Sequence, residues 1–253
     1  MLKKRIIPSL LIKDNKLVKG KKFNNYVNVG NPVSAIKVYS HQYADELIFI
    51  RIDNSDPISD LINALKLASE NCFAPLTAGG GIKEQNEINL LCKNGADKVL
   101  LNSILHYDKN FLKDASKNFG RSTLVAGIDI IEENSKFFIT YNCNKNINRE
   151  TNLIDWLKFL EDNGAGELYI NFVNNDGMMN GYKISLAQLI CNNTSLPVIF
   201  NGGAGNFNHL YELFTETKVS AAGCSSIFHF GDNNPIRANT YLRSKKINLK
   251  KIK

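Results

Sequence analysis

The sequence contains one long unit twice. The segment from Gly79 to Ser103 recurs from Gly202 to Ser226, at an offset of 123 residues. Each copy is predicted to be an apolar strand that ends in a glycine pair, a helical stretch, and a second strand that ends in a small hydroxyl residue. Because solenoid repeats have periods of about 20–50 residues, a repeat of this length instead predicts two similar halves that close into one body.

The repeat extends over most of the chain. Residues 44–47 match residues 165–168, and residues 6–11 align with residues 124–129. Short apolar runs alternate with amphipathic stretches, which is the pattern of parallel strands joined by helices. The length of 253 residues is usual for a closed α/β barrel. We therefore predict a single (βα)8 TIM barrel domain over residues 1–253, built from two half-barrels. Its eight strands are predicted at Arg5–Leu11, Glu46–Ile52, Phe73–Ala78, Lys98–Leu101, Thr123–Ile130, Glu167–Phe172, Pro197–Asn201 and Val219–Cys224.

Local signals predict helix starts and two long connections. Asn31-Pro32 and Asp56-Pro57 each combine a capping residue with a proline of the first helical turn. The connections over residues 13–30 and 132–149 follow equivalent strands of the two halves, and loops of this length are often functional. The second contains an alternating stretch, Lys136–Tyr141, that predicts a hairpin. Both connections are expected to cover the same mouth of the barrel.

Composition argues against several classes of protein. The net charge of +7 is spread mostly over lysines, with no basic run interleaved with aromatic residues, so no nucleic-acid partner is expected. Five widely spaced cysteines without a Cys-x-x-Cys pair predict neither a disulfide framework nor a zinc site, and no metal or cofactor is expected. The apolar stretch near the start is too short for an export signal, and no segment approaches the roughly 18 apolar residues of a membrane span. A cytoplasmic location is therefore expected.

The glycine pairs are candidates for phosphate binding. Active sites of such barrels lie at the carboxyl ends of the strands, where Gly79-Gly80 and Gly202-Gly203 are predicted. Glycine lets backbone N–H groups approach an anion closely, and Ser103, Ser225 and Ser226 can add hydroxyl donors. A lone Gly-Gly pair is more often only a tight turn, but the duplicated pairs predict a ligand with phosphate at both ends.

Asp129 is the candidate catalytic acid. It ends the predicted fifth strand, where a carboxylate can serve as general acid or base or can merely cap a turn. The equivalent position on the first strand is Leu11, so a pair of carboxylates is not available at these two positions. Asp53 and Asp176 are further acids expected near the mouth, although Asp176-Gly177 is equally typical of a turn.

Four charged residues mark the opposite end of the barrel. Each stands at the start of a predicted strand, and two are positive and two negative. Individually they are ordinary solvated charges, but as a set at one level they are expected to form a ring across the barrel floor. These residues are Arg5, Glu46, Lys98 and Glu167.

Several of these motifs, in this order and spacing, resemble the cyclase subunit of imidazole glycerol phosphate synthase, over essentially the full chain. The motifs lie at residues 4–8, 18–20, 44–47, 79–82, 95–99, 102, 176–177, 180–182, 202–205 and 228–230. The resemblance implies a (βα)8 barrel that receives ammonia from a separate glutaminase subunit docked at the barrel floor, as a heterodimer. The ammonia passes through the barrel to a substrate with two phosphates, which is cleaved and cyclised.

The resemblance also implies roles for single residues. Asp129 would be catalytic, Asp97 would face the glutaminase, and Lys19 would lie on the family's mobile first loop. The gate to the ammonia passage would be formed by Arg5, Glu46, Lys98 and Glu167. One phosphate would be held by Gly80, Asn102 and Ser103, and the other by Asp176, Gly177, Gly203, Ser225 and Ser226.

The chain departs from the family's pattern at the centre of the mouth. Leu11 replaces a catalytic aspartate of the first strand, and the loss of a general acid or base typically costs about 10²–10⁴-fold in rate. Arg51 replaces an aspartate late in the second strand. Further departures are Val27 for a basic residue, Asn171 for a threonine, and Met178 and Asn201 at polar positions near the second phosphate.

Three functions follow from these observations. The sequence favours the barrel subunit of a glutamine-dependent synthase that does not make imidazole glycerol phosphate. By resemblance, such members serve amidino-sugar and surface-polysaccharide synthesis, with a sugar-modifying amidotransferase as a further partner. The second function is a true cyclase of histidine biosynthesis, against which Leu11 and Arg51 count. The third is a non-catalytic phosphate-binding scaffold that activates its glutaminase, against which the four floor charges count.

Overall fold

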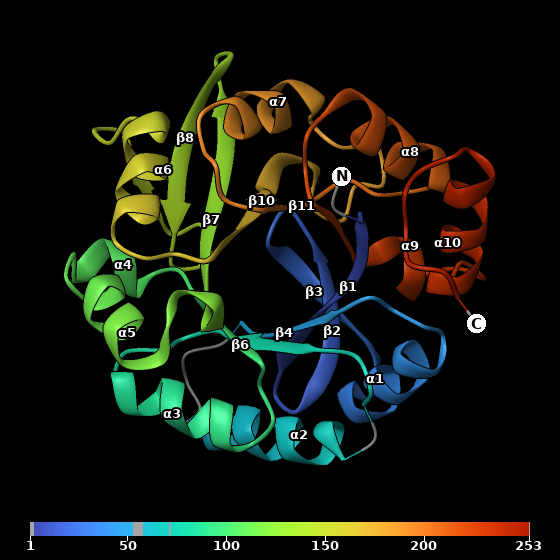
Figure 1. The fold of residues 1–253 in the computed structure, drawn as a ribbon, viewed down its shortest axis with the longest axis horizontal. Helices are drawn as coiled ribbons and strands as arrows, with labels where there is room; N and C mark the ends of the chain where they lie inside the picture. Colours follow the sequence, from blue (N-terminus) through green and yellow to red (C-terminus); the bar gives the residue numbers. More distant parts are fainter. Residues whose placement is uncertain (1–2, 53–57, 71, 253) are drawn as a thin grey trace.

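Eight parallel strands close into a barrel that is surrounded by helices (Figure 1). The computed structural model describes residues 3–52, 58–70 and 72–252. The barrel closes because β1 pairs with both β12 and β4, and β10 pairs with both β7 and β11. The predicted (βα)8 TIM barrel is therefore confirmed. The barrel strands are β1 (Arg5–Lys13), β4 (Leu47–Arg51), β5 (Leu76–Gly79), β6 (Lys98–Leu101), β7 (Leu124–Glu133), β10 (Glu167–Phe172), β11 (Val198–Asn201) and β12 (Ala221–Cys224).

The helices form the outer ring. The Asn31-Pro32 prediction is confirmed, because the Asn31 side chain accepts a hydrogen bond from the Ser34 amide at 3.0 Å and caps α1. The predicted start at Asp56-Pro57 lies outside the described residues. The helices are α1 (Pro32–His41), α2 (Ser59–Ser69), α3 (Gln85–Lys93), α4 (Ile104–Tyr107), α5 (Phe111–Phe119), α6 (Leu153–Asp162), α7 (Ile184–Asn192), α8 (Phe207–Glu216), α9 (Ser226–His229) and α10 (Pro235–Ser244), with short 3₁₀ turns at Arg121–Thr123 and Val173–Asn175.

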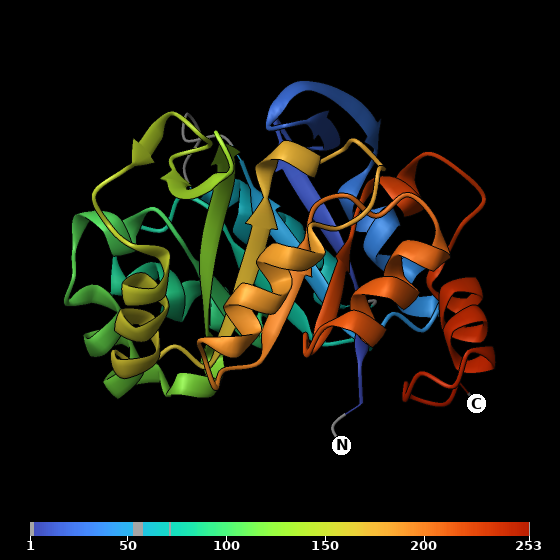
Figure 2. The same ribbon diagram turned by 90° about the horizontal axis from the view of Figure 1, so that it is seen from above.

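Both long connections continue as antiparallel strands beyond the barrel. The predicted hairpin after the fifth strand is confirmed, since β8 (Lys136–Tyr141) pairs with β7, and β9 (Asn146–Asn148) pairs with β8. The first connection also forms strands, β2 (Lys16–Lys21) and β3 (Asn24–Gly30), where the sequence predicted only a long loop. Both hairpins rise on the side opposite the N-terminus, as Figure 2 shows. They flank the same mouth, as expected.

One predicted strand begins later than expected. The run from Phe73 was predicted as strand, but β5 begins at Leu76, and the Phe73 side chain is 88% exposed. Pro75 stands just before the strand and has no N–H to donate to a neighbouring strand. Its carbonyl instead accepts the amide of Leu47 at 2.9 Å. Similarly, the last strand begins at Ala221 rather than Val219.

The apolar core has two layers. Side chains of the strands that point outward pack against the helices in one large cluster, whereas those that point inward form a separate cluster in the lumen. The alternation of strand side chains explains the division, as Ile6 belongs to the outer cluster and Ile7 to the lumen. The lumen cluster comprises Ile7, Ile48, Leu100, Val125, Tyr169, Ile199 and Ala221, with Ile50 packed against it.

Over the ranges that the structure describes, no helix is both long enough and apolar enough to cross a membrane.

Candidate functional site

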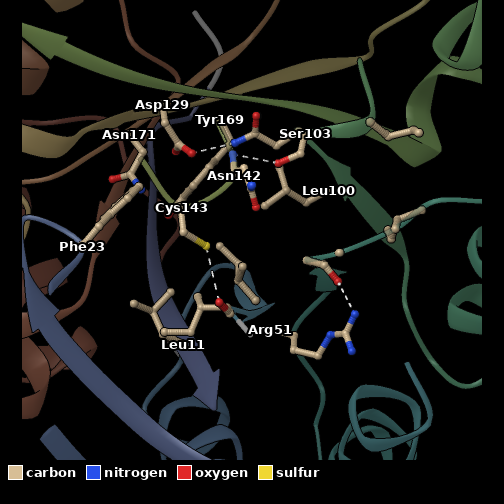
Figure 3. Close-up of a pocket in the computed structure, with 18 of the residues that line it drawn as sticks. Leu11, Phe23, Arg51, Leu100, Ser103, Asp129, Asn142, Cys143, Tyr169 and Asn171 are labelled. Atoms are coloured by element: carbon tan, nitrogen blue, oxygen red, sulfur yellow. Dashed lines mark hydrogen bonds between the residues drawn. The ribbon is translucent and has the colours of Figure 1, made fainter. Parts of the chain in front are cut away.

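A cavity of about 400 Å³ opens at the carboxyl ends of the strands. Side chains of the barrel strands line it together with Phe23 and Cys143, which follow β2 and β8 (Figure 3). Leu11, Arg51 and Asp129 all line this cavity. The structure therefore has a cavity at the mouth that the sequence predicted as the active site, and its wall carries both a carboxyl and a guanidinium.

Asp129 is buried at the cavity wall and is surrounded by amides. Its side chain is 8% exposed, and its Oδ2 accepts a hydrogen bond from Asn102 Nδ2 at 2.8 Å. Burial raises the pKa of Asp129 to about 7, although hydrogen bonds from Asn102 and Asn171 act in the opposite direction. A carboxyl with this pKa is present in both protonation states near neutral pH, which suits a general acid or base.

Asn171 and Asn201 hold this arrangement in place. Asn201 Nδ2 donates to Asn171 Oδ1 at 2.7 Å, which leaves the Asn171 amide nitrogen for Asp129. The two asparagines stand opposite each other in the register of β10 and β11. Two of the departures from the family's pattern therefore form one connected amide network around the remaining acid.

The pKa of Asp129 predicts a pH-dependent stability difference. The folded-state pKa lies above the ordinary value of 3.8, so the folded protein binds the Asp129 proton more tightly than the unfolded chain does. This contribution to the free energy of unfolding is complete below about pH 4 and is lost as the pH rises to about 7. We expect the wild type to lose up to about 1.4 kcal/mol per pH unit over this window relative to Asp129→Asn. Urea unfolding of both proteins at pH 5, 6, 7 and 8 measures this difference. A difference that does not change with pH would contradict the burial of an ionisable carboxyl.

Leu11 provides no proton-transferring group. Among the described residues that line the cavity, Asp129 is the only acid. Asp53 was predicted as another acid near the mouth, and it lies outside the described residues. Asp176 lines a different, smaller cavity. The missing first-strand aspartate therefore has no carboxyl substitute among the described residues that line this cavity.

The first predicted phosphate cradle, formed by Gly80, Asn102 and Ser103, lies in the same cavity as Asp129. Gly80 adopts φ +105°, and a Cβ at this position would lie 2.0 Å from the Arg51 carbonyl oxygen, so only glycine fits. Ser103 Oγ accepts the Asn142 amide at 3.1 Å and keeps its own proton for donation. An anion in this cradle would lie close to the acid, because Asn102 contacts Asp129 directly.

The second predicted cradle comprises Asp176, Gly177, Gly203, Ser225 and Ser226. The structure brings these five residues together around a cavity of only about 10 Å³. Ser225 Oγ donates to the Ser9 carbonyl at 2.6 Å. The buried hydroxyl of Ser226 has no hydrogen-bond partner among the described residues.

Lys19 lines the second cradle and forms an ion pair with one of its members, Asp176. Its Nζ lies 2.5 Å from Asp176 Oδ1, and the two side chains are 2% and 3% exposed. The amide of Lys22 also donates to the Asp176 carbonyl at 2.8 Å. The hairpin that carries Lys19 is thus bound to the segment after β10. The sequence placed Lys19 on the first loop but provided no sign of this ion pair.

Breaking the Lys19–Asp176 pair is expected to destabilise the protein. Removing one member of a buried ion pair leaves an uncompensated charge and costs about 3–5 kcal/mol. We expect Lys19→Met to lower the free energy of unfolding by about this amount and to increase hydrogen exchange in β2 and β3. The double variant Lys19→Met/Asp176→Leu should recover most of the loss, because neither charge then remains buried. Equal losses in the single and double variants would show that the pairing itself is unimportant.

The four floor charges form a closed ring. Arg5 contacts Glu46 at 2.8 Å and also pairs with Glu167, while Lys98 contacts Glu46 at 3.1 Å and Glu167 at 2.8 Å. Burial acts to lower the pKa of Arg5, but the hydrogen bonds and charges of the two glutamates raise it overall. Thr77 Oγ1 donates to Glu46 Oε1 at 2.8 Å. The predicted ring is therefore present, at the amino ends of the strands.

Asp97 lies at this same end of the barrel. It precedes Lys98 of the ring, and its exposed side chain accepts the Leu76 amide at 2.8 Å. The position is compatible with the predicted interface, while the hydrogen bond also serves to start β5.

Several residues of the mouth were not singled out from the sequence. Tyr169 lines the cavity, and its hydroxyl lies 3.2 Å from Ser9 Oγ. It precedes Asn171 by two positions on β10, so strand alternation placed both on the inner face. Phe23 and Tyr26 reach the cavity from the first hairpin. Their role depends on how the hairpin folds back, for which the sequence carries no comparable signal.

The chain is similar to known proteins over nearly its whole length. Residues 5–234 match the model of the family described as histidine biosynthesis protein. The chain is 40% identical over 233 residues to imidazole glycerol phosphate synthase subunit HisF of Staphylococcus saprophyticus, and the aligned region covers 90% of this chain and 92% of that protein. It is 35% identical over 251 residues to the protein of the same name from Hydrogenobaculum sp., which covers 99% of this chain and 100% of that protein.

Proposed function

Because the chain belongs to the histidine biosynthesis protein family and is a HisF-like synthase subunit, we propose that it conducts ammonia through its barrel from a glutaminase partner to a phosphorylated ligand. The observation that carries this proposal is the ring of Arg5, Glu46, Lys98 and Glu167 at the entrance to the lumen. Apolar side chains would seal this end of the barrel at least as well, because replacing buried ion pairs by well-packed apolar residues is often neutral or stabilising. The stability of the barrel therefore does not explain the ring.

The lumen beyond the ring suits a neutral molecule. Its walls are apolar, with Ile7, Ile48, Val125 and Ile199 among them. Ammonium would have to give up its hydration to enter such a space, whereas ammonia carries no charge and loses much less. The ring would thus admit ammonia at the floor, and the lumen would deliver it towards Asp129 at the mouth.

The partner would dock at the floor of the barrel. The relatives are named as subunits of a synthase, and Asp97 is an exposed acid at that face. The test is reconstitution of the purified chain with its glutaminase. We expect the chain to increase glutamine hydrolysis and to form a heterodimer in size-exclusion chromatography. If the glutaminase neither bound the chain nor changed its rate, the proposal would be wrong.

The mouth supports a reaction other than the cyclisation of the family. Leu11 cannot transfer a proton, and the cavity holds Arg51 where the family has an aspartate. We therefore favour a subunit that serves amidino-sugar or surface-polysaccharide synthesis, with a sugar-modifying amidotransferase as a further partner. The ligand would still be phosphorylated, and the position of Gly80, Asn102 and Ser103 around the mouth cavity supports this part of the proposal.

A genuine cyclase of histidine biosynthesis is the second candidate. It is favoured by the 40% identity to a HisF protein and by the pKa of about 7 at Asp129, which would let one carboxyl act as acid and base in turn. Turnover of the bisphosphate substrate of that cyclase, with excess ammonium, separates the two functions. Turnover by the wild type would establish the cyclase. Turnover only by Leu11→Asp would support a repurposed barrel.

A third candidate, a scaffold that binds phosphate and only activates the glutaminase, predicts no ammonia-dependent chemistry at all. The same assay therefore tests it, because glutamine hydrolysis would rise while neither ammonium nor glutamine supported product formation.

A further inference from the structure

The mouth cavity ends at Tyr169. Two buried members of the lumen cluster, Leu100 and Tyr169, also line this cavity, and so does Ile50, which packs against the cluster. Figure 3 shows Leu100 and Tyr169 among the side chains around the cavity. Of the described residues, the other members of the cluster do not line it. These three side chains therefore form the boundary between the mouth and the lumen.

The Tyr169 hydroxyl reaches across the interior of the barrel. It lies 3.2 Å from Ser9 Oγ, and either hydroxyl can donate the hydrogen bond. Tyr169 belongs to β10 and Ser9 to β1, and β11 and β12 stand between these two strands in the sheet. Both side chains point inward, since Ser9 follows Ile7 of the lumen cluster by two positions. The bonded pair thus spans the lumen instead of following its wall.

Small neighbours leave space for the tyrosine ring. Gly127 is the register partner of Tyr169 on β7, and it faces inward because it alternates with Val125 of the lumen cluster. It brings no side chain to the interior, and Ser9 brings only a short one. Val125, which is in register with Glu167 of the floor ring, is one inward-facing level closer to the floor than Gly127. The ring of Tyr169 therefore lies between this deeper part of the lumen and the mouth.

We propose that Tyr169 closes the lumen at its mouth end, as a second closure besides the floor ring, and that its hydrogen bond to Ser9 holds it shut. The closure can open because the cavity of about 400 Å³ above it can receive the ring. While it is shut, water and ligand in the mouth are kept out of the lumen. The role in nitrogen transfer rests on the proposed function: ammonia would reach Asp129 only while the ring is turned away from Ser9.

The hydroxyl group of Tyr169 is the part that a simple core residue would not need. A phenylalanine would fill the same space without burying a polar group, which costs free energy unless it is hydrogen-bonded. Burial raises the pKa of the Tyr169 hydroxyl above its usual value, although the hydrogen bond with Ser9 acts in the opposite direction, so the group keeps its proton near neutral pH. The bond to Ser9 can therefore break and form again without a change of charge, as a closure that opens during turnover requires.

The experiment measures the access of methyl methanethiosulfonate, a small uncharged thiol reagent, to the lumen of the full chain. Val125→Cys introduces a thiol at a fully buried position of the lumen cluster, and mass spectrometry follows its modification. We expect Tyr169→Phe, which loses only the hydrogen bond, to raise the rate about two- to tenfold. Tyr169→Ala removes the ring and leaves a cavity, so it should raise the rate more than about tenfold.

Two controls distinguish opening of the lumen from loosening of the whole fold. Cys224 is buried in the outer cluster, so its modification in the same samples reports general opening and should stay at the wild-type rate in the Tyr169 variants. Tyr182→Phe is the matched substitution, because it removes another buried tyrosine hydroxyl, which donates to the Gly223 carbonyl at 2.8 Å. It should leave the rate of the Val125→Cys thiol unchanged.

Equal modification of the lumen thiol with and without the Tyr169 substitutions would overturn the proposal, as would an equal rise at Cys224. Modification of this thiol as fast as that of the exposed Cys143, with Tyr169 in place, would also overturn it. If Tyr169→Ala does not fold, Tyr169→Phe decides alone, and an unchanged rate then refutes the closure. The reagent requires neither glutaminase nor ammonia, so failure of this closure and failure of the ammonia pathway would be recognised separately.

Discussion

Replacement of Asp129 by asparagine is expected to lower turnover by about 10²–10⁴-fold, the usual effect of losing a general acid or base. Asparagine has nearly the same shape, but its single oxygen can accept only one of the two hydrogen bonds that Asn102 and Asn171 donate, and it cannot transfer a proton. The loss should be at the upper end of this range, because no other acid lines the described part of the cavity. Ligand affinity should change much less than the rate.

The pH profile makes this prediction specific. Since the pKa of Asp129 is about 7, the wild-type rate should show a transition near neutral pH that Asp129→Asn lacks. Steady-state rates between pH 5 and 9, with ammonium as the nitrogen source, provide the measurement. Asp155→Asn, which changes an exposed acid on α6, is the matched control and should retain the wild-type rate and profile. An active Asp129→Asn variant with the wild-type profile would remove Asp129 from the chemistry.

Lys98→Ala is expected to separate the two sources of nitrogen. Lys98 contacts both glutamates of the floor ring, so its removal leaves Glu46 and Glu167 with Arg5 as their only partner in the ring. We expect glutamine-driven product formation to fall at least about tenfold, because the entrance no longer keeps its closed geometry. Activity with free ammonium should remain near the wild-type value, since ammonia can then reach the mouth from solution.

The measurement compares both activities in the reconstituted complex, together with glutamine hydrolysis. Lys98→Arg keeps the positive charge and is expected to retain more glutamine-driven activity than the alanine variant. In Lys98→Ala, the two buried glutamates have lost one cation, which lowers the free energy of unfolding by up to about 3–5 kcal/mol if neither glutamate takes up a proton. The assays therefore need a temperature well below that of unfolding. If both activities of Lys98→Ala matched those of the wild type, the ring would not be a gate.

The predictable part of this protein depended on periodic features of the chain. Alternating apolar runs and amphipathic stretches predicted the barrel, since each strand and helix needs one buried face wherever it lies. The ring at the floor was predictable for a related reason. Arg5, Lys98 and Glu167 begin strands, Glu46 directly precedes one, and parallel strands of a closed barrel start at one level. The positions of Gly80 and Gly203 in the two predicted cradles followed from the repeat, whereas Gly177 was assigned only by the family resemblance.

The tertiary structure decided what the site can do. Lys19 was a loop residue in the sequence, and only the folding of β2 and β3 over the mouth buries it against Asp176. In the sequence, Arg51 was only a departure from the family's pattern. The structure places its guanidinium beside the Gly80 carbonyl, where the end of β4 meets the turn after β5. The pKa of Asp129 likewise depends on burial by several strands and on amides from two of them. Burial and electrostatic fields sum over groups far apart in the chain, so local sequence determines which residues are available and the closed barrel determines how they act.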